Sequence, residues 1–134
     1  MKRQYIKRKS SKRKRKKRTK RQILKEKLWE LTKSAIRRRD DYICQHCGKP
    51  VQGRDAQTSH VISRTQSLRL FFDLVNLKLL CQSCHNWWHA NPTLSGIWFD
   101  EKFPKRKEYL DEKIKEQIIP VKDYELQEWI KAYE

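Results

Sequence analysis

Two pairs of cysteines constrain this chain more than any other feature of its sequence. Cys44 and Cys47 form one C-x-x-C pair, Cys81 and Cys84 form the other, and the chain has no further cysteine. Each C-x-x-C loop can direct two thiolates at one ion, and two loops complete the tetrahedral shell that zinc prefers. This spacing favours a closed structural zinc site and a reducing compartment over disulfide bonds or four unrelated buried thiols.

Such a site would compensate for a thin hydrophobic core. The chain has 134 residues, enough for one domain, and only 37% of them are hydrophobic. Small domains bury a smaller share of their surface than large ones, so apolar burial alone stabilises them weakly. A structural zinc ion can contribute on the order of 10 kcal/mol to folding. We therefore predict a single zinc-stapled domain over residues 22–134.

Positive charge is concentrated at the N-terminus. The chain carries 33 Lys and Arg against 16 Asp and Glu, a net charge of +17. Residues 1–21 hold 14 of these cations and no acid, which leaves 19 cations against 16 acids in the rest, or about +3. A cationic run this dense repels itself and buries no apolar surface, so it predicts a disordered tail over 1–21 whose partner is a polyanion.

The sequence has no feature of a membrane or secreted protein. No stretch is apolar and long enough to cross a bilayer, and the cationic N-terminus lacks the apolar region of a secretory signal. We expect a soluble protein of the cytoplasm or nucleoid with no membrane partner.

An amphipathic helix is predicted directly after the tail. Its apolar residues recur at helical spacing and its other face carries Lys and Glu, which predicts a helix that ends near Arg39. The apolar residues are Leu24, Leu28, Trp29, Leu31, Ala35 and Ile36.

The remaining elements are short. Residues 57–63 read as a strand, 68–73 as strand or loop, and 75–80 as a weakly alternating strand that leads to the second cysteine pair. A helix is expected from Gln82 to the Asn91-Pro92 step, because proline disfavours helix in the residue before it. Two further helices are expected near 105–117 and 122–133.

Three polar residues lie between and after the cysteine pairs that a plain zinc ribbon does not need. His60 falls in the first predicted strand, Asn76 opens the second, and His85 directly follows Cys84. Over residues 42–91 this combination resembles the HNH nuclease family, in which a β-hairpin and a following helix clamp one divalent ion. The resemblance implies an α+β fold: a zinc-stapled ββα-metal module with one N-terminal and two C-terminal helices.

The resemblance also implies roles for these residues. His60 matches the general base that activates a water for attack on phosphorus. Asn76 matches the residue that pins the hairpin loop and so orients that histidine, and His85 matches a ligand of the catalytic metal. His89 lies one helical turn after His85 and matches the second helix ligand of nuclease colicins.

Two positions leave the metal shell incomplete. Many family members place an aspartate or histidine ligand directly before the base, where this chain has Ser59. Serine could ligate weakly or through water, or Asp55 could reach in. Arg64, four residues after His60, is expected to contact the scissile or an adjacent phosphate.

A narrower likeness points to branched DNA. The His60-Val-Ile-Ser-Arg64 string, the later Leu-Arg-Leu-Phe run and the C-terminal helices look like phage recombination endonucleases of the NinG/Rap group, which act on branched DNA. The chain departs from that group by having histidine where asparagine is common after the second cysteine pair. This likeness would suit a phage-encoded protein in a bacterial host.

The sequence thus predicts a metal-dependent DNA endonuclease, a phosphodiester hydrolase. It would use Mg²⁺, Mn²⁺ or Ni²⁺ beside structural Zn²⁺. One metal and one histidine base together can activate the nucleophile, neutralise charge and assist the leaving oxygen. The alternative is a non-catalytic zinc module that binds nucleic acid.

The tail residues expected to contact DNA are Lys12, Arg13, Lys14, Arg15, Lys16, Lys17 and Arg18. Oligomeric state stays open.

Overall fold

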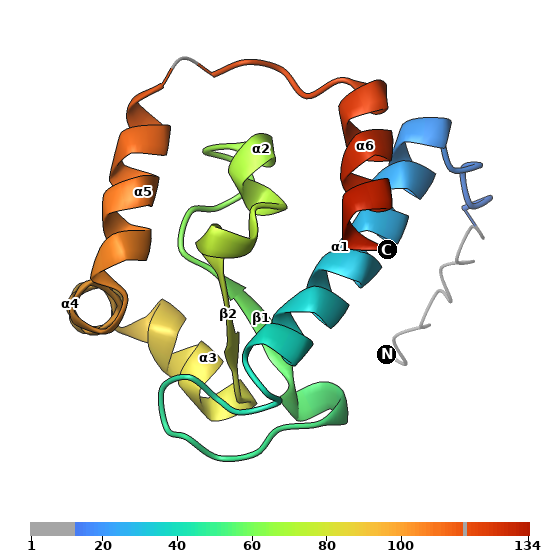
Figure 1. Cartoon of the computed structure of the whole chain (residues 1–134). Coiled ribbons are helices and arrows are strands. Elements are labelled where there is room, and N and C mark those ends of the chain that lie inside the picture. The colour runs from blue at the N-terminus through green and yellow to red at the C-terminus, as the bar shows by residue number, and fades with distance from the viewer. Residues whose placement is uncertain (1–12, 117) are drawn as a thin grey trace, which may run out of the picture.

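Helices surround a short two-stranded sheet in the computed structural model, which describes residues 13–116 and 118–134 (Figure 1). The predicted DNA contact Lys12 lies outside the described residues. In chain order the elements are α1 (Lys20–Arg39), a 3₁₀ turn (Gly53–Asp55), β1 (Gln57–His60), α2 (Leu68–Phe71), a second 3₁₀ turn (Leu74–Asn76), β2 (Leu77–Leu80), α3 (Gln82–Ala90), α4 (Pro92–Lys102), α5 (Pro104–Lys115) and α6 (Asp123–Tyr133). The predicted α+β class is confirmed.

The two strands pair antiparallel and present two different faces. Ser59 lies opposite Lys78, and His60 lies opposite Leu77. Cross-strand partners share a face and successive residues alternate. Gln57, Ser59 and Lys78 therefore face one side, where α3 packs, while His60 and Leu77 face the other side, where α1 packs.

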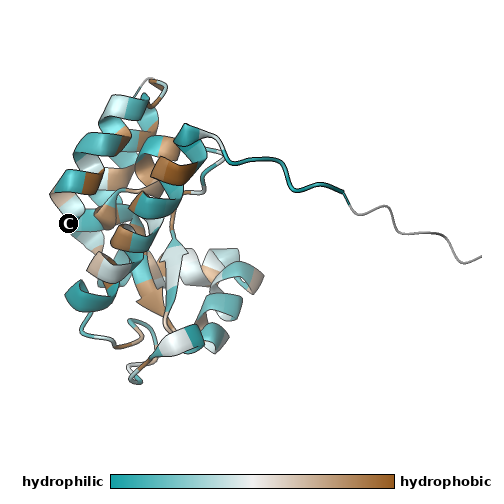
Figure 2. Cartoon of the chain, turned by 90° about the vertical axis from the view of Figure 1, so that its right-hand side faces the viewer, coloured by the Kyte–Doolittle hydropathy of each residue, from teal (hydrophilic) through white to brown (hydrophobic). Residues whose placement is uncertain are grey.

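Helix α1 begins inside the segment that the sequence assigned to the tail. Thr19 caps it in a capping box with Gln22, so helical structure starts at Lys20. Arg21 already belongs to the folded part, because its guanidinium donates to the Asp123 carboxylate at 2.7 Å and to the Val121 carbonyl at 2.7 Å. Residues 13–18 are exposed and form no regular structure, and the hydrophilic segment before α1 extends away from the helices (Figure 2).

Two of the helices close the fold by packing side by side. The buried Leu28 of α1 meets Leu126 and Ile130 of α6, with Phe72 and Val121 completing the cluster. In Figure 1 these two helices lie together on one side of the hairpin, and α5 lies on the other. Within the described residues, no helix is long and apolar enough to cross a membrane.

The edge of β2 is covered by the end of α1. The Asp40 carboxylate accepts from the Leu79 N–H at 2.9 Å, and Arg39 donates to the Leu77 carbonyl at 2.6 Å and the Leu74 carbonyl at 2.5 Å. Arg39 also pairs with Asp40 at 2.9 Å. These side chains form hydrogen bonds with backbone groups that an edge strand leaves free. Arg39 and Asp40 thereby hold β2 against α1.

Two predictions about the helices need correction. Residues 68–73 were expected as strand or loop, but Leu68–Phe71 is helical, since the Ser67 hydroxyl caps it by accepting from the Leu70 N–H. The helix α4 was not predicted, so three helices follow α3 in the described residues instead of two. Pro92 ends α3 as expected, but it also serves as the first residue of α4, where its missing N–H costs nothing.

Candidate active site

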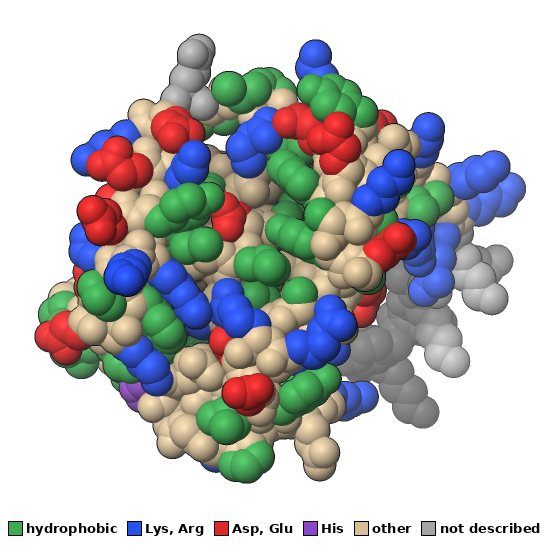
Figure 3. All heavy atoms as spheres, viewed as in Figure 1, with side chains coloured by type: hydrophobic (Ala, Val, Ile, Leu, Met, Phe, Trp, Pro, Cys, Tyr) green, Lys and Arg blue, Asp and Glu red, His purple; other side chains and the backbone are tan. Residues whose placement is uncertain are grey.

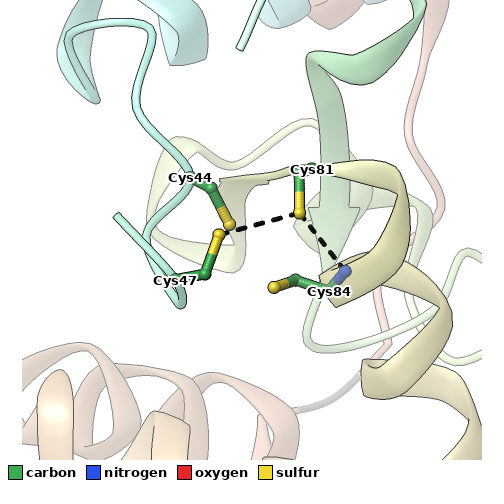
Figure 4. A group of neighbouring side chains, drawn as sticks. All are labelled: Cys44, Cys47, Cys81 and Cys84. Carbon is green, nitrogen blue, oxygen red and sulfur yellow. Dashed lines mark hydrogen bonds between the residues drawn. The ribbon is translucent and has the colours of Figure 1, made fainter. Parts of the chain in front are cut away.

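The four cysteine sulfurs converge from two loops. Cys44 and Cys47 come from the loop after α1, and Cys81 and Cys84 come from the junction of β2 with α3 (Figure 4). All four sulfurs lie within 4.8 Å of one another, and the Cys47 and Cys81 sulfurs are 3.8 Å apart. Zinc–sulfur bonds of about 2.3 Å at tetrahedral angles separate the sulfurs by roughly 3.8 Å. The cluster therefore has the donor type and spacing that suit zinc.

The electrostatics of the cluster call for a cation. Burial raises the pKa of Cys44, but the backbone N–H groups of Cys47, Cys81 and His46 outweigh it and bring that pKa to about 7. Burial and the neighbouring sulfurs hold the pKa of Cys84 above its usual range. Four thiolates this close repel one another, so only a bound metal ion can keep all of them deprotonated.

A histidine inside the first pair caps this cluster. The His46 Nδ1 lies 3.2 Å from the Cys84 sulfur, and its ring stacks on Trp87 with centroids 4.1 Å apart. Burial and the charge of Lys102 lower the pKa of His46. The contact suits an N–H···S hydrogen bond to a thiolate, which places His46 beside the cysteine cluster as a neighbour of its ligands.

Two other histidines meet on the exposed side of α3. The Nε2 atoms of His85 and His89 are 3.1 Å apart. The His85 Nδ1 lies 2.7 Å from the Oε1 of Gln57, whose amide nitrogen is already used in donating to the Arg54 carbonyl at 3.1 Å. This fixes the amide orientation, so the His85 Nδ1 carries the proton and its Nε2 offers a lone pair. The pair can hold a metal ion.

The ring of His60 packs in a cluster with Phe71 and Trp29, whose own ring centroids are 5.0 Å apart. Its centroid is 4.1 Å from that of Phe71 and 5.2 Å from that of Trp29, and it is nearly parallel to both. The His60 Nε2 lies 3.2 Å from the Phe71 carbonyl oxygen, which can only accept. The Nε2 must therefore be the donor, which leaves Nδ1 as the basic atom.

The surroundings of His60 keep it neutral. Burial lowers its pKa to about 4, and the charges of Lys78, His85 and His89 act in the same direction, while the bond to the Phe71 carbonyl opposes them. A neutral imidazole is the form that can accept a proton. The described structure brings His85 and His89 together, but no direct hydrogen bond joins either of them to His60.

Asn76 ties the segment after β1 to β2. Fully buried, its Oδ1 accepts from the Ile62 N–H at 2.7 Å, and its Nδ2 donates to the carbonyls of Ile62 at 2.8 Å and Leu70 at 2.9 Å. These three bonds hold both ends of the connection that carries Phe71. Asn76 thus fixes the carbonyl that His60 binds.

The two open candidates for a further metal ligand are occupied by other partners. The buried Ser59 hydroxyl accepts from the Lys78 ammonium group at 3.1 Å. The Asp55 carboxylate accepts from the Gln82 N–H at 2.9 Å and pairs with Lys49 at 3.0 Å. Asp55 therefore caps α3, and the expectation that it could reach the metal is not met in this structure.

Lys78 is a feature that the sequence analysis missed. Its side chain is fully buried, and its Nζ lies 3.3 Å from the ring centroid of Trp88, beside Ser59. Burial lowers its pKa well below the usual range, and the charge of Arg106 adds to the effect. No sequence signal marks it, because a single lysine in a short alternating strand normally faces solvent. Gln57, Trp29 and Phe71 were missed as well, because residues of these types are common in any strand or helix.

Comparison with known protein families finds one match, which covers the residues of the candidate site. A family model described as HNH endonuclease matches residues 44–91, a segment that contains both cysteine pairs, the β-hairpin and α3. No curated protein and no solved structure matches the chain. The predicted HNH domain is confirmed, and the likeness to phage recombination endonucleases stays a prediction.

We predict that Cys44→Ser or Cys84→Ser releases zinc and unfolds the domain, because either change opens a four-sulfur shell that a thin core cannot replace. Zinc content and thermal unfolding measure this. Ser83→Ala is the matched control, since Ser83 is exposed between two ligands. Full zinc content together with the unfolding midpoint of the unaltered chain in both cysteine variants would refute a shared site.

We also predict a pH signature of His60. Its ordinary pKa is 6.5 and its folded value is about 4. Between these values the unfolded chain binds a proton that the folded chain does not. The free energy of unfolding therefore falls as the pH drops from 6.5 towards 4, and above pH 6.5 this loss is absent. His60→Phe keeps the stacking and removes this loss. Chemical denaturation of both proteins at several pH values should give stability curves that diverge across this window, and parallel curves would contradict the assignment.

Proposed function

Because residues 44–91 are an HNH domain, we propose that this chain is a metal-dependent endonuclease that hydrolyses phosphodiester bonds in DNA. One observation carries the proposal. The His85 and His89 nitrogens face each other 3.1 Å apart, while Gln57 holds the proton of His85 on its far nitrogen. In this structure the His89 Nε2 donates to the unprotonated His85 Nε2. If His89 moved its proton to Nδ1, the two Nε2 atoms would offer a divalent ion two neighbouring ligands. Such an ion would polarise the scissile phosphate and stabilise the leaving oxygen.

His60 acts as the general base in this proposal. Its Nε2–H donates to the Phe71 carbonyl and keeps its proton, so Nδ1 takes a proton from the attacking water. Stacking on Phe71 and Trp29 restricts the ring to one plane. Asn76 is a positioning residue, since it holds the segment that presents the Phe71 carbonyl.

The cysteine cluster takes the structural role. Cys44, Cys47, Cys81 and Cys84 would hold Zn²⁺ in a closed shell with no position for a substrate. Since His85 directly follows Cys84, this zinc ion would fix the start of the helix that carries both catalytic-metal ligands. The two metals therefore have separate functions.

Basic side chains near the start of α1 support DNA as the substrate. Figure 3 shows Lys and Arg gathered at the edge of the molecule where the N-terminal segment joins α1. Burial lowers the pKa of Lys25, and the charges of Arg21 and Arg64 act in the same direction. Arg64 is exposed and follows His60 along the chain. We propose that it contacts a phosphate beside the scissile one.

The rival function is a non-catalytic zinc module that binds nucleic acid. It accounts equally well for the cysteines and for the basic segment. It gives no reason for two histidine nitrogens 3.1 Å apart on α3 together with a half-buried neutral histidine at the end of β1. Branched DNA is the finer proposal and rests on the sequence likeness alone; a panel of linear, nicked, forked and four-way DNA tests it directly.

We predict that His60→Ala retains zinc and fold but slows cleavage by about 10²–10⁴-fold, the usual contribution of a positioned base. His85→Ala should lower cleavage as well, with recovery at high metal concentration. Asn86→Ala is the control, because Asn86 is exposed on the same helix. Single-turnover cleavage with saturating DNA measures the rates. Equal rates for His60→Ala and the unaltered chain would remove the catalytic assignment and leave the binding module.

The basic segment should supply affinity without chemistry. Replacing Lys12, Arg13, Lys14, Arg15, Lys16 and Lys17 with glutamine should flatten the dependence of log affinity on log salt by up to about five, since each phosphate contact contributes about 0.9. Arg18 is kept because it pairs with Glu26. The single-turnover rate at low salt and saturating DNA should stay unchanged.

The control for this experiment replaces Lys12, Lys14, Lys16 and Lys17 with arginine and leaves Arg13 and Arg15 in place, which preserves the charge. It should restore the salt dependence of the unaltered chain. An unchanged slope in the glutamine variant would show that the segment does not hold DNA. A lower single-turnover rate at saturation would show that it helps to build the active site.

A further inference from the structure

A cavity of about 280 Å³ lies between three helices, apart from the site residues described above. Its walls come from α2 and the residues that follow it, from α5 and from α6. Figure 1 shows α2 between the other two helices. Neither the cysteine cluster nor His60, His85 and His89 border the cavity. It is therefore a separate candidate for binding a ligand.

Aromatic side chains border this cavity from two helices. Tyr109 comes from α5, and Trp129 and Tyr133 come from α6. The Tyr109 hydroxyl donates to the Asp73 carboxylate at 2.6 Å. The Tyr133 hydroxyl donates to the Phe72 carbonyl at 2.8 Å. These bonds fix two phenol rings at the wall, and aromatic rings held in this way are the surfaces on which unpaired nucleic-acid bases stack.

The cations that border the cavity already have acidic partners. Lys113 pairs with Glu116 at 3.2 Å. Arg69 pairs with Glu125 at 2.8 Å. A bound phosphate needs cations without such partners, and an acyl chain would cover these charges without replacing their water. A neutral, flat ligand with polar edges suits the cavity better than either.

The size and the place of the cavity suit one base of a DNA substrate. Binding sites for small molecules begin at about 300 Å³, so a cavity of about 280 Å³ suits a single small ring system. Leu70 and Phe72 border it. Between them, Phe71 stacks on His60 and accepts from its Nε2. The cavity and the proposed general base thus contact the same short segment.

A second hollow, of about 310 Å³, adjoins the cavity on the side of the basic N-terminal segment. It shares Arg69 and Lys113 with the cavity and is also bordered by Arg21. Arg21 lies in the first turn of α1, close after the exposed basic residues 13–18. A DNA strand that this segment holds would therefore reach the cavity along the second hollow.

We propose that, within the nuclease function proposed above, this cavity seats one unpaired base of the DNA substrate. Trp129 and Tyr109 stack on the base. The Arg69 guanidinium, 5.7 Å from the centroid of the Trp129 ring, offers a further flat surface. A base within a duplex is paired and stacked on its neighbours, so it cannot enter. The cavity therefore favours DNA with unpaired bases, such as bulged, forked or branched DNA.

A single bulged nucleotide tests this proposal with the unaltered chain. Two duplexes of the same sequence carry one bulged nucleotide, which has its base in the first duplex and is abasic in the second. The phosphates are equal in number, so the charge that attracts the protein is equal as well. We expect the duplex with the bulged base to bind about tenfold more tightly, a typical gain for a base stacked on an aromatic side chain.

Fluorescence anisotropy gives the Kd of each complex. The protein is loaded with zinc and no other divalent ion is added, so that cleavage does not interfere. A duplex without a bulge should bind like the abasic one. Equal affinity for the two bulged duplexes would overturn the proposal, and so would a perfect duplex that binds as tightly as the one with the bulged base.

Two variants locate the effect at the cavity. Tyr109→Leu and Trp129→Leu each remove a ring and keep an apolar side chain, so each should reduce the preference for the bulged base to about twofold or less. Affinity for the abasic duplex and zinc content should stay unchanged, which shows that the variants are folded. Tyr124→Leu is the matched control, since Tyr124 is exposed on α6 and does not border the cavity. An undiminished preference in both cavity variants would overturn the proposal.

These outcomes separate the base site from the activity. A preference for the bulged base that depends on Tyr109 and Trp129, with no cleavage of any DNA, would leave the base site standing and remove the nuclease. Cleavage of DNA combined with equal affinity for the two bulged duplexes would leave the nuclease standing and overturn the base site.

Discussion

Four cysteine sulfurs within 4.8 Å of one another join two parts of the chain that lie far apart in the sequence. One part is the loop after α1, and the other is the point where β2 ends and α3 begins. The Cys81 sulfur also accepts from the Cys84 N–H at 3.4 Å, so a cluster ligand is the N-cap of α3. Fixing these sulfurs fixes the start of α3 relative to β2. The phase of the helix follows, and with it the directions of His85 and His89.

The short hairpin carries site groups on both of its faces. Each strand has four residues, and His60 is the last residue of β1. Its ring faces α1, whereas Gln57 and Ser59 face α3. Burial is the largest cause of the low pKa of His60, and the charges of Lys78, His85 and His89 act in the same direction.

The sequence predicted what local patterns and ligand chemistry determine. The cysteine spacing identified the cluster, the apolar period identified α1, and the Asn91-Pro92 step located the end of α3. The start of α1 was missed by two residues because Arg21 is held by partners a hundred positions away, Asp123 and Val121. The helix α4 was missed because one proline both ended a helix and began the next. Long-range pairing and double roles of this kind leave no local pattern.

The candidate site likewise combines residues that a sequence pattern marks with residues that only the fold brings into place. His60, Asn76, His85 and His89 could be proposed as site residues because their types and spacing resemble the HNH pattern. The groups that set their protonation and direction could not, since glutamine, phenylalanine and lysine are common in any strand or helix. Only the fold shows that Gln57 holds His85, that the Phe71 carbonyl holds His60, and that Lys78 is buried beside Ser59.

The low pKa of His60 has a consequence for a reaction on DNA. A base works best when its pKa lies near the working pH, and a value of about 4 makes the imidazole a weak base in the free protein. Burial is the main cause of that value. A phosphate bound beside the ring would favour the imidazolium and raise the pKa, because opposite charges stabilise each other strongly in a site with little water. A bound phosphate would therefore bring the pKa of His60 closer to the working pH of a general base.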